Sequence, residues 1–187
     1  MTLILASILE SGAVLAADSR IAHGPSGEPN QRDVADKLFP VRSCAVASFG
    51  TSPANTNIPE LILSFDKGPP ATPMQLANDI YEKISSLSDQ GDFGMLVLGM
   101  AEGKPSLCEV KSKQGVVALN IEEGAPLSRG VAMSFGNVHF EGSMAELQAQ
   151  FLSVFRQATQ QNDAVGPPYD FATLSLDGSL NISSNDS

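Results

Sequence analysis

The sequence predicts an α+β domain in which helices pack on β-sheets, and three observations lead to this class. Residues 2–9 and 13–17 are apolar nearly throughout, as in strands that are covered on both faces. Residues 73–87 and 144–161 carry apolar side chains at helical spacing. The order of elements is strands, helices, strands, helix and strand, which differs from the regular alternation of a βαβ fold.

Length and composition fit one compact domain. The chain has 187 residues, of which 42% are hydrophobic, enough to bury a sizeable core. We expect one domain over residues 1–178 and a polar, flexible tail over residues 179–187. The net charge of −10 disfavours binding to nucleic acid or to an anionic membrane.

Cofactor chemistry and export are also disfavoured. Cys44 and Cys108 are too few for a disulfide framework or a zinc site, and His23 and His139 lack metal-ligand spacing. No metal or other cofactor is therefore expected. The apolar N-terminus has no basic residue before it and is interrupted at residues 10–12, which disfavours a signal peptide. These features predict a reduced, cytoplasmic protein.

The first part of the chain predicts mostly strands. A turn at residues 10–12 joins the two N-terminal strands, and residues 23–32 (HGPSGEPNQR) read as a loop. Residues 38–49 predict a pair of strands with a turn near Arg42 and Ser43. A short helix is expected over residues 57–65, with Pro59 in its opening turn.

Capping signals define the two longer helices. Thr72 and Pro73 are a typical start for the helix over residues 73–87, which is followed by strands at 93–100, 106–110 and 116–119. Ser143 and Glu146 have the spacing of a capping box at the start of a helix that runs to about residue 161. Residues 171–176 predict the last strand.

Common catalytic motifs are absent, but the position of Thr2 is informative. The chain contains no P-loop, dinucleotide fingerprint, Gly-x-Ser-x-Gly elbow or His-Glu-x-x-His motif. Removal of Met1 would give Thr2 a free α-amine, and this amine can act as the general base for the threonine hydroxyl. We expect methionine removal to suffice, with no further propeptide. Taken by itself, a threonine at position 2 is an ordinary start residue in most proteins.

The residues around Thr2 favour the catalytic interpretation. TLILASILESGAVLAADSR, followed by DKLFPVRSCAVASFG, resembles the N-terminal half of bacterial proteasome β-type subunits, which are N-terminal nucleophile hydrolases. The segment FGMLVLGMAEGKPSLCEVKSKQG resembles the central hairpin of this family, so the similarity extends over about residues 2–125. The resemblance implies a four-layer α-β-β-α sandwich of two antiparallel sheets.

The resemblance also implies roles for individual residues. Thr2 matches the nucleophile, Asp18 its acidic partner and Lys37 the catalytic lysine, while the Gly50 N–H matches the oxyanion donor. Arg20 matches an arginine that we interpret as a member of a structural ion pair. Without Thr2, Asp18 and Lys37 would read as an ordinary ion pair.

The second half of the chain departs from the family pattern. Ser134 matches the position of a helper serine, with Ser143 as a rival that we interpret as a helix cap. Asp163 matches the family's aspartate, but Gly166 stands where a nearby serine is usual. Only one convincing helix is expected here, in place of the usual pair.

Matching positions also suggest a substrate pocket. By their sequence distances from Asp18, Lys37 and Gly50, three residues match positions that line the pocket in this family, and they would favour apolar substrate side chains: Ile21, Ala35 and Ser48.

The leading hypothesis is a threonine endopeptidase that hydrolyses unfolded polypeptides or peptides inside a homo-oligomeric double ring, with an ATP-dependent unfoldase as a possible partner. Two alternatives stay open: a catalytically silent ring subunit that acts as a scaffold or gate, and an amidase for small molecules.

Overall fold

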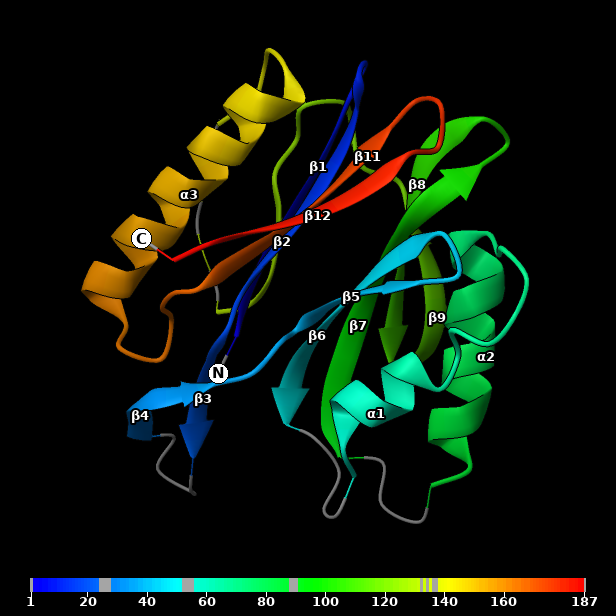
Figure 1. Cartoon of the computed structure of the whole chain (residues 1–187), viewed down its shortest axis with the longest axis horizontal. Helices are drawn as coiled ribbons and strands as arrows, with labels where there is room; N and C mark the ends of the chain where they lie inside the picture. Colours follow the sequence, from blue (N-terminus) through cyan, green and yellow to red (C-terminus); the bar gives the residue numbers. More distant parts are fainter. Residues whose placement is uncertain are drawn as a thin grey trace.

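The computed structural model describes residues 2–23, 28–51, 56–87, 91–131, 133, 135 and 138–186, and for residues 21–23 and 28–34 it describes the backbone alone. These residues form two five-stranded antiparallel sheets and a two-stranded ribbon (Figure 1). The first sheet has the order β10 (Leu127–Gly130), β1 (Leu3–Leu9), β2 (Gly12–Asp18), β11 (Tyr169–Ser175) and β12 (Leu180–Asn185). The second has the order β5 (Leu38–Val41), β6 (Cys44–Thr51), β7 (Asp92–Ala101), β8 (Lys104–Lys111) and β9 (Gly115–Leu119). The ribbon pairs β3 (Arg20–His23) with β4 (Glu28–Val34).

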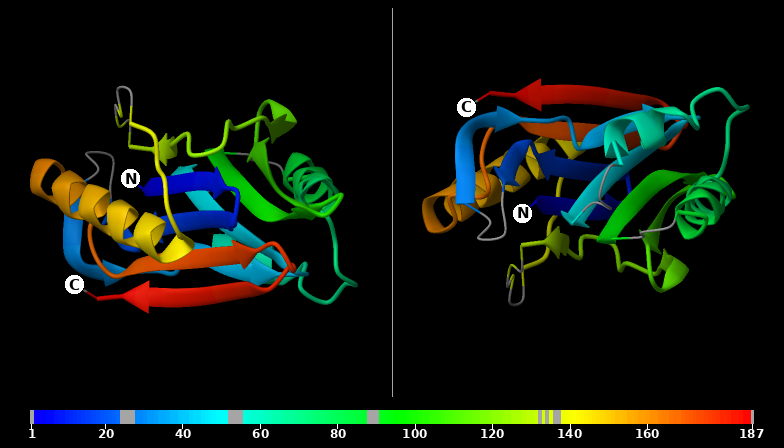
Figure 2. Two further views of the ribbon diagram at one scale, coloured as in Figure 1. Left: turned by 90° about the horizontal axis from the view of Figure 1, so that it is seen from above. Right: turned by 90° about the horizontal axis from the view of Figure 1, so that it is seen from below.

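Three helices occur among the described residues. The longer two are α2 (Pro73–Ser85), which packs on β7, β8 and β9, and α3 (Met144–Gln161), which packs on β1, β2 and β11. The third, α1 (Ile58–Leu63), lies beside β5. Figure 2 shows α3 lying across the sheet that contains β1 and β2. None of these helices is long and apolar enough to cross a membrane.

The predicted four-layer α-β-β-α sandwich is wrong as the fold class. The described residues form a mainly β protein with few helices, because one long helix, rather than a layer of helices, packs on each five-stranded sheet. The described residues between Val131 and Gly142 form no helix, where the sandwich would have one.

The burial pattern explains the continuously apolar N-terminal strands. In β1, Leu3 and Leu5 pack under α3, whereas Ile4 and Ala6 belong to the core between the two sheets. Both faces of the strand are therefore covered, and its residues are buried except for the partly exposed Ile8. The predicted hairpin of residues 2–9 and 13–17 is confirmed as β1 and β2.

The other local predictions are largely confirmed. The structure has the strand pair β5–β6, the strands β7–β9 and β11, and all three expected helices within a few residues of the predicted bounds. Thr72 and Ser143 form capping boxes with Gln75 and Glu146, as their spacing predicts.

Four elements differ from the sequence predictions. Residues 28–32, predicted as loop, belong to β4, and the strands β3 and β10 were not predicted. The expected flexible tail includes β12, which pairs with β11 along its whole length. This strand is held because Leu180 and Ile182 pack against the core between the sheets.

A partly buried ion pair links the two sheets close to the start of β1. Glu109 of β8 is 5% exposed and accepts hydrogen bonds from Arg129 of β10, at 2.5 Å from Nε and 3.0 Å from Nη2. Such a bidentate pair fixes the direction of β10. The next residue, Gly130, then lies against Thr2.

Candidate functional site at the start of β1

Asp18, the last residue of β2, connects two segments that are distant in sequence. It is fully buried, and its Oδ1 accepts the backbone N–H of Leu3 at 2.7 Å. Its Oδ2 accepts a hydrogen bond from Lys37 Nζ at 3.2 Å. One carboxylate thus holds the residue after Thr2 with one oxygen and Lys37 with the other.

Lys37 lies directly before β5 and is 8% exposed. Its Nζ donates a second hydrogen bond to the backbone carbonyl of Arg20. Burial lowers the pKa of Lys37, and the Asp18 carboxylate partly opposes this effect. Burial likewise raises the pKa of Asp18, while Lys37 and the backbone N–H groups of Leu3 and Gly166 lower it. These opposing interactions favour the ionised pair over either charge alone.

Thr2 is held through its backbone. It is 6% exposed, and its carbonyl accepts the N–H of Val131 at 2.8 Å. Gly130 has a φ of +84°, and a Cβ at this position would lie 1.8 Å from the Thr2 carbonyl oxygen. This close approach requires glycine, so Gly130 helps to define the position of Thr2.

The backbone geometry at position 50 explains why this residue is glycine. Its φ is +93°, it pairs with Phe93 of β7, and a Cβ would lie 2.6 Å from the carbonyl oxygen of Asp92. The residue type is thus explained by strand geometry, and the role of its N–H as oxyanion donor stays a prediction.

Asp163 is connected to the candidate site through its backbone carbonyl and Arg20. Its backbone carbonyl accepts Arg20 Nη1 at 2.8 Å, so its contact with the Lys37 region passes through Arg20. A Cβ on Gly166 would lie 2.2 Å from the guanidinium carbon of Arg20. Glycine at position 166 therefore makes room for Arg20. The predicted helper, Ser134, lies outside the described residues.

Two of the three predicted pocket residues make backbone hydrogen bonds at or next to Lys37. The N–H of Ala35 donates to the Ser19 carbonyl at 2.9 Å, and the N–H of Ser48 donates to the Lys37 carbonyl at 3.0 Å. The side chain of Ile21 lies outside what the structure describes. The structure therefore joins Asp18 to Lys37 and to Leu3, the residue after Thr2, while the substrate pocket stays a prediction.

Sequence reasoning missed a contact next to this group. Ser19 Oγ donates to Asp170 Oδ2 at 2.9 Å. Asp170 is an isolated carboxylate near the start of an otherwise mostly apolar strand, and this was the one signal that could have singled it out.

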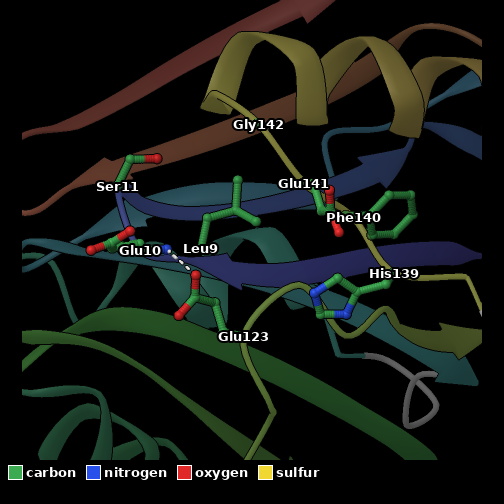
Figure 3. Close-up of a pocket in the computed structure, with 8 residues that line it drawn as sticks. All are labelled: Leu9, Glu10, Ser11, Glu123, His139, Phe140, Glu141 and Gly142. Carbon is green, nitrogen blue, oxygen red and sulfur yellow. Dashed lines mark hydrogen bonds between the residues drawn. The ribbon is translucent and has the colours of Figure 1, made fainter.

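A different pocket lies at the opposite end of β1. It has a volume of about 320 Å³ and is lined by Leu9, Glu10, Ser11, Glu123, His139, Phe140, Glu141 and Gly142 (Figure 3). Within it, the N–H of Glu10 donates to Glu123 Oε1 at 3.2 Å. None of the predicted site residues lines this pocket. No group of three or more His, Cys, Asp or Glu side chains in the described part of the chain could hold a metal ion.

The fold is similar to that of solved Anbu structures. An Anbu (Gly-1) mutant from Hyphomicrobium sp. strain MC1 has a TM-score of 0.76 at 16% identity, with 100% of this chain and 89% of that chain covered. Anbu from Yersinia bercovieri, described as an ancestral beta-subunit, has a TM-score of 0.73 at 18% identity, covering 98% and 88%. Anbu from Pseudomonas aeruginosa, solved as a helical assembly, has a TM-score of 0.71 at 16% identity, covering 99% and 86%.

These comparisons correct the resemblance inferred from the sequence. No family model matches the chain, and no curated protein matches it. The structures named above are Anbu chains, and at 16–18% identity they show a shared fold alone. The identification as a bacterial proteasome β-type subunit homologue is therefore wrong. The neighbour from Pseudomonas aeruginosa is described as a helical assembly.

Proposed function

We propose that this protein hydrolyses peptide bonds with Thr2 as the nucleophile, within an assembly of several copies. The observation that carries the proposal is the double role of Asp18, which binds both the Leu3 amide and Lys37 Nζ. Through Asp18, the buried Lys37 is linked to the residue after Thr2, and its positive charge is what this chemistry needs once Thr2 is N-terminal.

The proposed reaction begins when every residue that precedes Thr2 has been removed. The free α-amine accepts the proton of the Thr2 hydroxyl while Oγ attacks the carbonyl carbon of the substrate. The C–N bond then breaks, and the leaving amine takes the proton from the α-ammonium group. Water subsequently attacks the ester carbonyl, and Thr2 Oγ leaves with a proton to restore the hydroxyl.

Lys37 has an electrostatic role in this sequence. Its charge disfavours protonation of the nearby α-amine and stabilises negative charge that develops on Thr2 Oγ. Asp18 holds Lys37 in place and raises the pKa of Lys37 against the larger, opposite effect of burial. The Gly50 N–H is our candidate for the oxyanion donor, and polypeptide segments with apolar side chains are our candidate substrates.

An assembly of several copies is supported by the helical assembly of one structural neighbour. A closed double ring and an unfoldase partner stay predictions of the sequence.

A catalytically silent subunit is the second candidate. The guanidinium group of Arg20 occupies the space beside Gly166, so no side chain could be added there without displacing it. A chain that keeps the Asp18–Lys37 pair for structural reasons alone would act as a scaffold or gate.

The test combines a panel of fluorogenic peptides and small amides with the variants Thr2→Ala and Thr2→Ser. Hydrolysis of peptides by the wild type, lost in Thr2→Ala and partly kept in Thr2→Ser, supports the proposal. Turnover of small amides alone indicates an amidase, and a folded wild type without any turnover indicates the silent subunit.

A further inference from the structure

Ser19 is fixed on three sides beside the candidate site. It is 1% exposed, and its Oγ donates to Asp170 Oδ2 at 2.9 Å. Its N–H donates to the Pro168 carbonyl at 3.0 Å, and its own carbonyl accepts the N–H of Ala35 at 2.9 Å. Ser19 thus links the end of β2, the segment before β11 and the segment that leads to Lys37.

The two neighbours of Ser19 each provide a hydrogen-bond acceptor for Lys37. Asp18 provides its carboxylate, and Arg20 provides its backbone carbonyl. Because one tripeptide holds both acceptors, a displacement of Ser19 would move both of them relative to Lys37 Nζ. The Ser19–Asp170 hydrogen bond ties this tripeptide to β11.

Charge gives Asp170 a second connection to Lys37. Among the residues whose side chains the structure describes, Asp18 of β2 and Asp170 of β11 raise the pKa of Lys37, and Arg20 of β3 lowers it. Asp170 therefore offsets part of the effect of Arg20 and of burial.

We propose that Asp170 is a positioning residue for Lys37, acting through Ser19 by geometry and through its own charge. This inference rests on the proposed function for its kinetic readout. The inference predicts that Asp170 helps to set the pH range in which Lys37 stays charged. Asp170 is not one of the residues proposed for catalysis, which are Thr2, Asp18, Lys37 and Gly50.

Two variants separate charge from geometry. Asp170→Asn keeps an oxygen that can accept the Ser19 hydroxyl but removes the negative charge. Ser19→Ala keeps the charge but removes the hydrogen bond. Thermal unfolding of both variants identifies the temperature range in which each is folded and can be assayed.

We expect Asp170→Asn to move the pH–activity profile to lower pH by about 0.5–1 unit, because the pKa of Lys37 falls further when a nearby negative charge is lost. The alkaline limb, along which Lys37 loses its proton, then begins earlier. We expect Ser19→Ala to lower kcat about five-fold with KM and the pH limbs nearly unchanged, since only the orientation of Lys37 changes.

A measurement that needs no activity separates this inference from the proposed function. The chain has six lysines, and ¹³C-labelling at Cε allows the titration of Lys37 to be followed by NMR, with Lys37→Arg to assign its signal. A lower pKa of Lys37 in Asp170→Asn supports the inference even if the wild type hydrolyses no peptide. An unchanged Lys37 titration in folded Asp170→Asn overturns it, as do unchanged kinetics in folded Ser19→Ala when the wild type is active.

Discussion

The two ends of β1 offer different kinds of candidate site. At the Leu9 end, a pocket of about 320 Å³ is lined by three glutamates and His139, all near the surface. At the Thr2 end, Asp18, Ser19 and Lys37 are buried and joined by hydrogen bonds to β1, β3 and β11. Burial of charge is costly without partners, so a fully connected buried group is the stronger sign of chemistry than an open acidic pocket.

The sharpest way to test this comparison is to remove the charges at the Thr2 end. We expect Lys37→Ala and Asp18→Asn each to reduce peptide hydrolysis by at least about 100-fold, because both leave the nucleophile without its positioned positive charge. Lys37→Ala also leaves Asp18 buried and unpaired, at a cost of about 3 kcal/mol in the free energy of unfolding. Steady-state kinetics and urea unfolding measure the two effects.

Lys83→Ala is the matched control, because Lys83 lies exposed in the last turn of α2. Its activity should equal that of the wild type. Wild-type turnover in folded Lys37→Ala would contradict the proposed role of the lysine.

The backbone of the Thr2 end should tolerate change less well than an open turn. We expect Gly130→Ala to lower the free energy of unfolding by about 3 kcal/mol or more, because its Cβ would overlap the Thr2 carbonyl. Gly103→Ala shares the positive φ but has no atom within 4 Å of the added Cβ, so its cost should be about 1 kcal/mol. Equal unfolding midpoints for the two variants would show that Thr2 is not held as described.

The Leu9 end should respond to acid through a helix cap. Glu146 accepts the N–H and the hydroxyl of Ser143, and these hydrogen bonds lower its pKa from the ordinary value of 4.5. A lowered pKa in the folded state means that this contribution to stability is present above pH 4.5 and is lost as the pH falls through the folded pKa.

Stability measured by urea unfolding between pH 3 and 7 tests this cap. The wild type should lose more stability toward low pH than Glu146→Gln, in which the titrating group is absent. Identical slopes for the two proteins would contradict the capping contribution.

The smallest effects should come from the pocket itself. We expect Glu10→Gln and Glu141→Gln to leave peptide hydrolysis within about two-fold and stability within about 0.5 kcal/mol of the wild type, since both side chains are exposed. A large loss of activity in either variant would move the functional site to this end of β1.

Local sequence signals predicted those parts of the fold that depend on neighbours in the chain. The β1–β2 hairpin follows from two apolar runs around a turn, and α3 follows from the Ser143 capping box and its apolar spacing. In contrast, β10 was missed because it pairs with β1 more than 100 residues away. The strand β12 reads as a polar tail because only Leu180 and Ile182 face the core. The fold class was wrong because a family pattern supplied helix layers that this chain does not form.

The candidate site, like the fold, contains features that the sequence predicted and features that it did not. The family resemblance around Thr2 pointed to Asp18 and Lys37, and the structure joins Asp18 by hydrogen bonds to Lys37 and to Leu3, the residue after Thr2. The Ser19–Asp170 contact joins residues 151 positions apart, so no local pattern indicates it. Gly166 appeared to be a lost serine, whereas the structure shows that its missing side chain makes room for Arg20.

The central claim is that Thr2, with a free α-amine, is the nucleophile. The most direct measurement is intact-mass spectrometry and peptide mapping after reaction with an electrophile that requires a hydroxyl and an α-amine on the same residue. We predict that Met1 is absent, that one adduct forms on Thr2, and that Lys37→Ala slows its formation while Lys83→Ala does not. Hydrolysis of peptides by a protein that retains Met1, or an active protein in which Thr2 stays unlabelled, would contradict the account.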